Sequence, residues 1–220
     1  MSNIFKSSIG RKIAMALSGI FLIVFLTQHF LINITSVFSE EIFNMLSHFM
    51  GNNPLVQFIL QPILIAGVLF HFVMGFVLEW QNRKARPVTY AIYKGSRNSM
   101  FVSRNMIISG IVILSFLALH FYDFWVPEMD YKYVKSLPED PNRYYEELIE
   151  KFENPVRVGL YCLSFIFLAL HLVHGLSSST QSLGTNNKYA ITIKKISFAF
   201  GVGIPLGFCF IALYHHILHL

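Results

Sequence analysis

Five long runs of apolar residues dominate the chain, and short polar or charged segments separate them. The runs cover approximately residues 12–33, 57–80, 103–125, 156–181 and 190–213. Each run exceeds the ~20 residues that an α-helix needs to cross about 30 Å of hydrocarbon. Lipid offers a backbone no hydrogen-bond partners, so membrane-spanning runs of this kind must be helices. The pattern predicts an all-α membrane protein, one domain over residues 1–220 built as a bundle of five transmembrane helices.

The composition excludes most other classes of protein. Hydrophobic residues make up 54% of the chain and charged residues only 13%, whereas soluble domains are about a quarter charged. Cys162 and Cys209 lie inside apolar runs and neither belongs to a CxxCH motif, so neither a disulfide scaffold nor covalent haem attachment is expected. We expect no internal repeat in the chain.

The charges predict an orientation in the membrane. Twelve of the seventeen basic residues lie in three segments or in the adjoining ends of the runs: before the first run, between the second and third, and between the fourth and fifth. The same side carries a single acid, Glu79, near the end of the second run. Most acids fall in the predicted outer loop 126–155, where residues 138–154 look like a surface segment with one short helix. Basic loops stay cytoplasmic, so we expect the N-terminus inside, the C-terminus outside, and a multi-pass location in the cell (inner) membrane. This asymmetry explains the net charge of +5 without a nucleic-acid partner.

Four histidines lie on four different runs, at two depths. His29 and His120 follow the cytoplasmic basic residues by 17 and 16 positions, which places both about 25 Å from that edge. The second and fourth runs lead back to the cytoplasm, and His71 and His171 on these runs lie within about 20 Å of the same edge. The depths predict an outer pair, His29 with His120, and an inner pair, His71 with His171. We expect the histidines at the end of the chain, His215 among them, to be solvated.

Paired histidines at these depths favour two haems. A haem with a neutral imidazole on each face is six-coordinate and suits electron transfer, and an apolar bundle excludes water around it. Gly75 and Gly175 lie one turn beyond His71 and His171 and would let a flat macrocycle approach the backbone. A single membrane histidine more often makes an interhelical hydrogen bond, so the paired depths are what favour metal binding over that alternative.

At these residues the sequence resembles the di-haem cytochrome b subunit of succinate:quinone oxidoreductases, in the form with one five-helix chain. The resemblance extends over essentially the whole chain and is carried by the following segments: Gly10-Arg11-Lys12, Ser18-Gly19, Gln28 to Asn33, His71 between Gly67 and Gly75, His120, and His171 to Gly175 followed by Leu183-Gly184.

The resemblance implies cofactors and partners. It implies an outer haem b on His29 and His120 and an inner haem b on His71 and His171, with these four residues as the metal ligands. It makes Ser18, Gly75 and Gly175 candidate haem contacts. It also implies a quinone site near the outer haem that uses a carboxylate after the first helix, for which Glu40 and Glu41 are the candidates. Its partners would be a flavoprotein subunit and an iron–sulfur subunit on the cytoplasmic side, membrane lipid, and membrane quinone.

One position departs from some fumarate reductases of this form. Those enzymes carry a glutamate two residues before the fourth-helix ligand, where this chain has Ala169. The resemblance therefore does not extend to a transmembrane proton path through that glutamate.

The sequence hypothesis is a membrane anchor that conducts electrons between an iron–sulfur subunit and a quinone, expected to be menaquinone. The chain would belong to a succinate dehydrogenase or fumarate reductase, although it would hold neither the succinate site nor a catalytic residue of its own. Two alternatives remain at this point: a cytochrome b subunit of hydrogenase or nitrate reductase type, and a haem-free transporter whose histidines only bond between helices.

Overall fold

The computed structural model describes residues 7–85, 106–185 and 189–219, and every regular element in these ranges is a helix. The elements in chain order are α1 (Ser8–Ile34), η2 (Thr35–Val37), α2 (Glu40–Asn52), η3 (Val56–Leu60), α3 (Gln61–Lys84), α6 (Met106–His120), η4 (Phe121–Trp125), α7 (Val126–Met129), η5 (Asp130–Val134), α8 (Arg143–Glu153), α9 (Pro155–Ser182) and α10 (Ala190–Leu218).

The prediction of five long apolar helices is confirmed. Continuous helical segments that are long and apolar enough to cross a membrane run over Ser8–Val37, Val56–Lys84, Met106–Val134, Pro155–Ser182 and Ala190–Leu218. This is the pattern of a multi-pass membrane protein. Much of the basic segment used for the orientation argument, residues 86–105, lies outside the described residues.

The connections contain more helix than the sequence indicates. The third long helix does not stop at Trp125, because two π-helical turns, η4 and η5, carry it on to Val134. The first connection folds into the amphipathic helix α2, which Ser39 caps by accepting a hydrogen bond from the Ile42 amide at 3.2 Å. The expected surface helix within residues 138–154 is α8.

Local signals at both ends fix the bounds of α9. The Asn154 side chain accepts hydrogen bonds from the amides of Val156 and Arg157 at 2.9 and 3.2 Å, and Pro155 occupies the first turn. Both features are favourable at a helix N-terminus. At the other end, Gly184 adopts a left-handed conformation with φ of 88°, which glycine tolerates without a Cβ penalty.

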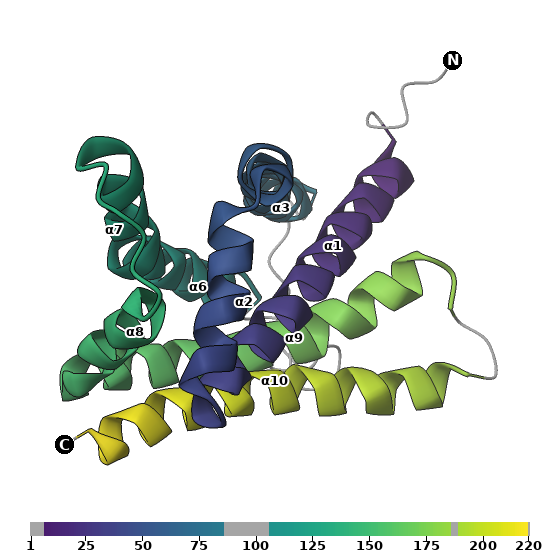
Figure 1. The fold of residues 1–220 in the computed structure, drawn as a ribbon. Helices are drawn as coiled ribbons and strands as arrows, with labels where there is room; N and C mark the ends of the chain where they lie inside the picture. The colour runs from purple at the N-terminus through teal and green to yellow at the C-terminus, as the bar shows by residue number, and fades with distance from the viewer. Residues whose placement is uncertain (1–6, 86–105, 186–188, 220) are drawn as a thin grey trace.

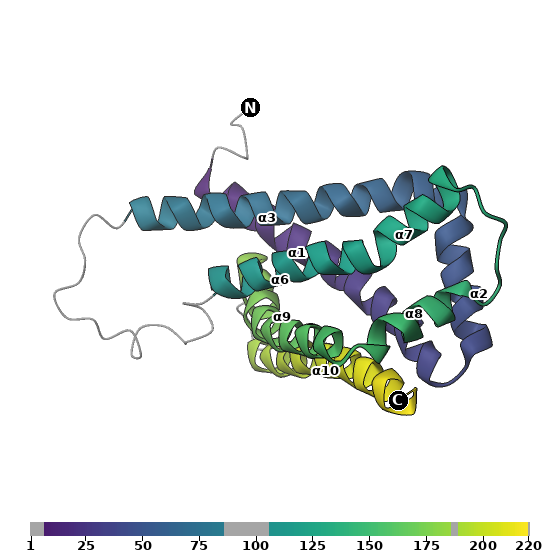
Figure 2. The same cartoon turned by 90° about the vertical axis from the view of Figure 1, so that its left-hand side faces the viewer.

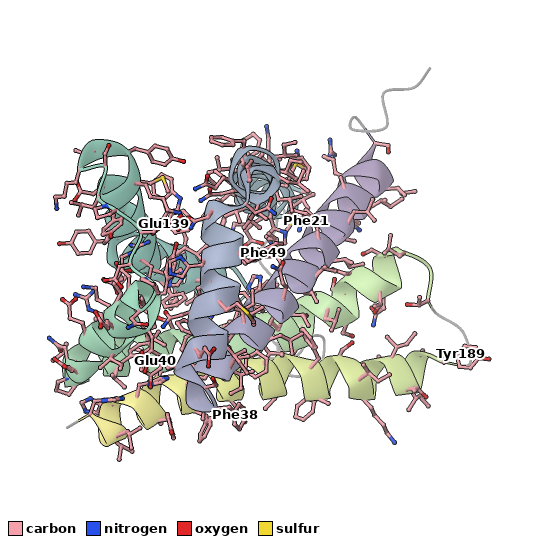
Figure 3. All side chains as sticks on the ribbon, in the orientation of Figure 1. Phe21, Phe38, Glu40, Phe49, Glu139 and Tyr189 are labelled. Carbon is pink, nitrogen blue, oxygen red and sulfur yellow. The ribbon has the colours of Figure 1, made fainter. Side chains whose placement is uncertain are left out.

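The long helices cross one another. Helices α9 and α10 lie side by side and antiparallel, whereas α3 is seen nearly end-on in Figure 1 and along its length in Figure 2, so it crosses that pair steeply. Helix α1 runs obliquely between them. Phe21 projects from α1 toward α3 (Figure 3) and lies against Gly67, where a Cβ would come within 2.6 Å of its ring.

Buried side chains gather at one end of the molecule, beneath α2 and α8. The cluster includes Phe43, Leu148, Phe152, Tyr161, Phe165 and Phe208. Along the rest of the long helices many large apolar side chains are exposed, including Leu31, Leu69 and Ile191. An exposed apolar surface of this size fits contact with lipid.

The antiparallel contact of α9 with α10 provides a test of the packing. A Cβ on Gly201 would lie 2.8 Å from the backbone nitrogen of Val173, whereas a Cβ on Gly203 would meet nothing within 4 Å. We expect Gly201→Ala to lower the free energy of unfolding by about 1–3 kcal/mol through overpacking. Gly203→Ala should be neutral or stabilising by up to ~1 kcal/mol, because alanine favours helix. Thermal unfolding of the two variants in detergent checks this, and equal midpoints would contradict the close packing.

Candidate functional site

The outer pair of histidines meets in the structure. His29 near the end of α1 and His120 at the end of α6 have ring centres 5.8 Å apart, with their planes at 82°. His120 immediately precedes the π-turn η4, and π-turns within helices are often found at functional sites. The pair comes from two helices that are far apart in sequence, as the depth argument predicts.

The inner pair meets as well. His71 on α3 and His171 on α9 have ring centres 6.3 Å apart, with their planes at 66°. Ser18 on α1, which contacts His71, precedes His29 by eleven residues, so the two pairs are separated by about 16 Å along α1.

The spacing of each pair fits one shared metal ion. A metal ion bound between two imidazole nitrogens, about 2.0–2.1 Å from each, brings the ring centres to about 6 Å. Among the described residues no group of three or more His, Cys, Asp or Glu side chains is placed to hold a metal. A pair of imidazoles therefore suits a metal that brings its other ligands with it, as the iron of a haem does.

Aromatic rings enclose the outer pair. Phe25 stacks on His29 with ring centres 5.5 Å apart, and Phe116 stacks on His120 at 5.8 Å. The Nδ1 atom of His120 is buried and has no hydrogen-bond partner among the described residues. Asn33 approaches the His29 ring to 3.4 Å while donating to the His29 carbonyl at 2.8 Å. These contacts surround the two imidazoles with apolar rings, which suits the neutral imidazoles that haem ligation needs.

A cavity of about 590 Å³ adjoins the outer pair. Its volume falls within the range of about 300–1,000 Å³ that is typical of small-molecule sites. Most of its wall is apolar, with side chains from α1, α3 and the third long helix, and its polar end carries Glu128, Tyr144 and Glu147. The cavity therefore joins the outer histidines to a group of ionisable side chains.

The inner pair has a different environment, built from serines and glycines. The Ser18 hydroxyl lies 3.0 Å from Nδ1 of His71, and the Ser109 hydroxyl lies 3.2 Å from Nδ1 of His171. A Cβ on Gly19 would lie 3.5 Å from the His71 ring. Ser18 thus contacts a predicted ligand, and its expected contact with a haem stays a prediction, whereas the matching Ser109 was not predicted.

The two glycines expected at the inner haem lie against methionines. A Cβ on Gly75 would come within 3.6 Å of the Met15 methyl group, and a Cβ on Gly175 within 3.4 Å of that of Met106. Gly75 therefore lies beside α1, which carries Ser18, and Gly175 lies beside α6, which carries Ser109.

These matching contacts reveal an internal repeat, which corrects the expectation that the chain has none. Residues 15–30 and 106–121 are identical at eight of sixteen positions, with Met, Ser, Gly, Ile, Phe, Leu, His and Phe in the same order. His71-x-Val-x-Gly75 recurs as His171-x-Val-x-Gly175. Each half of the chain thus supplies one histidine to each pair. The repeat was readable in the sequence, with an offset of 91 residues in the first segment and of 100 residues in the second.

A buried polar group near the outer pair was missed by sequence reasoning. Asp123, with a side chain only 1% exposed, pairs with Arg157 and accepts a hydrogen bond from the Tyr161 hydroxyl at 2.7 Å. The Tyr161 ring also lies edge-on to His120, with centres 6.3 Å apart. An isolated charge would be very costly here, so the paired arginine is what makes the aspartate tolerable.

A second polar cluster lies at the far end of the cavity. Glu128 accepts from Tyr144 at 2.8 Å and pairs with Lys132 and Arg143. Arg143 also donates to Glu147 at 2.8 Å. Burial raises the pKa of Glu147, although the neighbouring Arg143 guanidinium acts in the opposite direction. Burial and the charge of Glu128 raise the pKa of the Tyr144 phenol.

Glu40 and Glu41 lie elsewhere. Both are exposed in the first turn of α2 and border a surface hollow with Asn44 and His48. Glu40 is labelled in Figure 3. Neither lines the cavity beside His29, and their role at a quinone stays a prediction.

The expectation that His215 is solvated is wrong. Its side chain is completely buried and Nε2 bonds to the Ser36 hydroxyl at 2.9 Å. The reason is that η2 and α8 fold back over the end of α10 and cover it.

The buried ion pair provides a stability prediction. Asp123→Asn should lower the free energy of unfolding by about 3–5 kcal/mol, because Arg157 keeps its charge without an anionic partner. Glu150→Gln is the control, since that carboxylate is 69% exposed and pairs only with Lys151, and such a change costs within about 0.5 kcal/mol. Thermal unfolding in detergent distinguishes the two variants. Equal stability would mean that the pair contributes nothing.

Comparison of the chain with models of known families, with curated protein sequences and with solved structures finds no match. The argument for a function therefore rests on the chemistry of the residues described above.

Proposed function

We propose that the chain is the membrane anchor and electron-transfer subunit of a succinate:quinone oxidoreductase, with two b-type haems each held by a pair of histidines. The observation that carries the proposal is the double pairing itself. The ring centres of His29 and His120 lie 5.8 Å apart and those of His71 and His171 lie 6.3 Å apart, and both distances are compatible with one shared metal ion in each pair. Four histidines on four different helices meet in two pairs, and this double pairing is what supports two metal sites.

The protein would hold the two haems, separate them from water and adjust their redox potentials. Haem b supplies one-electron transfer when bound between two imidazoles. His29 and His120 would hold one haem, with Phe25 and Phe116 stacked against the ligand rings. The second pair lies about 16 Å away along the helix axis. Because two histidines would hold each haem, neither site would offer an open position to oxygen.

His29 and His120 line the cavity, so the haem that they would hold takes the part next to them, and we place the quinone at the polar end. An isoprenoid quinone, which we propose is menaquinone, needs apolar walls for its tail and proton-exchanging groups at its head. The cavity offers both, because its apolar wall ends at Glu128, Tyr144 and Glu147. Glu128 is held by three donors, whereas Glu147 accepts only from Arg143 and has a raised pKa. Glu147 is therefore better suited to exchange a proton.

The proposed partners are a flavoprotein and an iron–sulfur subunit on the cytoplasmic face of the cell membrane. The orientation comes from the basic connections of the sequence. At the end of α3, Arg83 pairs with Glu79 at 2.7 Å and is largely exposed. Electrons would enter from that side, at the inner pair. Co-purification of the two subunits with the chain supports this assignment, and a hydrogenase or nitrate reductase subunit in their place would overturn it.

The haem proposal is tested by a reduced-minus-oxidised spectrum of the purified protein. We expect b-type bands, with about half of the signal lost in His71→Ala or His171→Ala and the other half in His29→Ala or His120→Ala. His216→Ala is the control, because its Nδ1 bonds to the Phe152 carbonyl at 2.8 Å. A wild-type spectrum without b-type bands would sink the proposal and favour a haem-free protein such as a transporter.

The quinone proposal has its own variant. Glu147→Gln should slow reduction of the protein by a menaquinol analogue about a hundredfold, since general acid–base groups contribute about 10²–10⁴. Its dithionite-reduced spectrum should stay unchanged. Glu150→Gln, on the same helix but largely exposed, should keep the wild-type rate. A normal rate in Glu147→Gln would remove that residue from the quinone site.

A further inference from the structure

We infer that Ser18 and Ser109 are positioning residues that fix the tautomer of the two inner histidines, so that each presents an unprotonated Nε2 to the metal. This inference rests on the proposed function, since it concerns the ligands of the inner haem. It assigns the two serines a role toward the imidazoles.

The direction of the hydrogen bonds follows from counting protons. The Ser18 hydroxyl carries one proton and donates it to the Met15 carbonyl at 2.8 Å, since a carbonyl can only accept. The same oxygen lies 3.0 Å from Nδ1 of His71. One hydroxyl proton cannot serve both contacts, so both are hydrogen bonds only when Nδ1 of His71 carries the hydrogen and donates it to the Ser18 oxygen, which is the tautomer that we assign.

A neutral imidazole has one ring proton. With that proton on Nδ1, Nε2 of His71 keeps its lone pair, and the structure gives Nε2 no hydrogen bond to a described residue. Metal-bound histidines commonly use this arrangement, in which the second ring N–H is donated to a neighbouring acceptor. Ser18 therefore prepares His71 for ligation through Nε2.

The second half of the chain repeats the arrangement. Ser109 donates to the Met106 carbonyl at 2.9 Å, and its oxygen lies 3.2 Å from Nδ1 of His171. Ser109 is 4% exposed, so no solvent competes for the bond. The two rings prepared in this way are those whose centres lie 6.3 Å apart.

Neither histidine of the outer pair has a serine hydroxyl beside its Nδ1 atom among the described residues. Nδ1 of His120 has no partner among the described residues, and the side chain nearest the His29 ring nitrogens is the amide of Asn33, which donates to a carbonyl. Replacing the serines should therefore affect the inner site alone.

The expected effect is on the iron potential. Donation of the Nδ1 hydrogen makes an imidazole a stronger electron donor to its metal, which stabilises the oxidised iron. Ser18→Ala and Ser109→Ala remove the acceptor, so each should raise the midpoint potential of the inner haem and leave that of the outer haem unchanged. The double variant should shift the inner potential further than either single variant.

The experiment is a spectroscopic redox titration of the purified full-length protein, with the low-spin ferric EPR signal as a second readout. Ser18→Thr and Ser109→Thr keep the hydroxyl and should restore the wild-type inner potential. Ser115→Ala is the matched control, because this serine on α6 donates only to the Ile111 carbonyl at 3.0 Å. Two wild-type potentials in both alanine variants would overturn the inference, as would an equal shift of both haems.

The two proposals fail in different ways. Absence of haem from the wild-type protein removes the proposed function itself. If the wild type holds two haems and their midpoint potentials do not change in the serine variants, the proposed function stands. Only the role of Ser18 and Ser109 is then removed.

Discussion

Two imidazoles held about 6 Å apart inside an apolar interior are the constraint on which the rest of the structure depends. Each pair draws one ring from each half of the chain, so neither half can complete a site alone. The histidine positions follow a repeat, with a serine and a glycine eleven and ten residues before each outer histidine. The same spacing on α1 and α6 therefore sets the depth of both pairs at once.

The remaining polar groups are arranged around this constraint by depth. The polar contacts at the inner pair join uncharged groups, namely serine hydroxyls and histidine ring nitrogens. Ionisable side chains gather near the outer pair and at the far end of its cavity, where Asp123, Glu128 and Glu147 each have a cationic partner. Buried charges without such partners would be costly in lipid. The proposed transfer of electrons at the inner pair and exchange of protons near the outer pair would use this division.

The sequence could predict what hydropathy and helical rise determine. The five spans follow from run length, and the pairing of His29 with His120 follows because every helical residue advances by about 1.5 Å. Hydropathy and helical rise do not predict which side chains far apart in the sequence come into contact. Arg157 and Asp123 are 34 residues apart, and the residues around each of them do not indicate that the two form a pair. The burial of His215 depends on how η2 and α8 fold over α10, which no periodicity in α10 encodes. Ser109 was readable in principle, since the segment around it repeats that around Ser18, but only once the two halves were aligned.

The central claim is tested most directly by locating iron. Crystals of the purified protein, measured at the X-ray absorption edge of iron, give an anomalous difference map in which each iron appears as a separate peak. The account predicts two peaks per chain, one between His29 and His120 and one between His71 and His171. A map without a peak at these two positions, or with iron bound elsewhere in the chain, would contradict it.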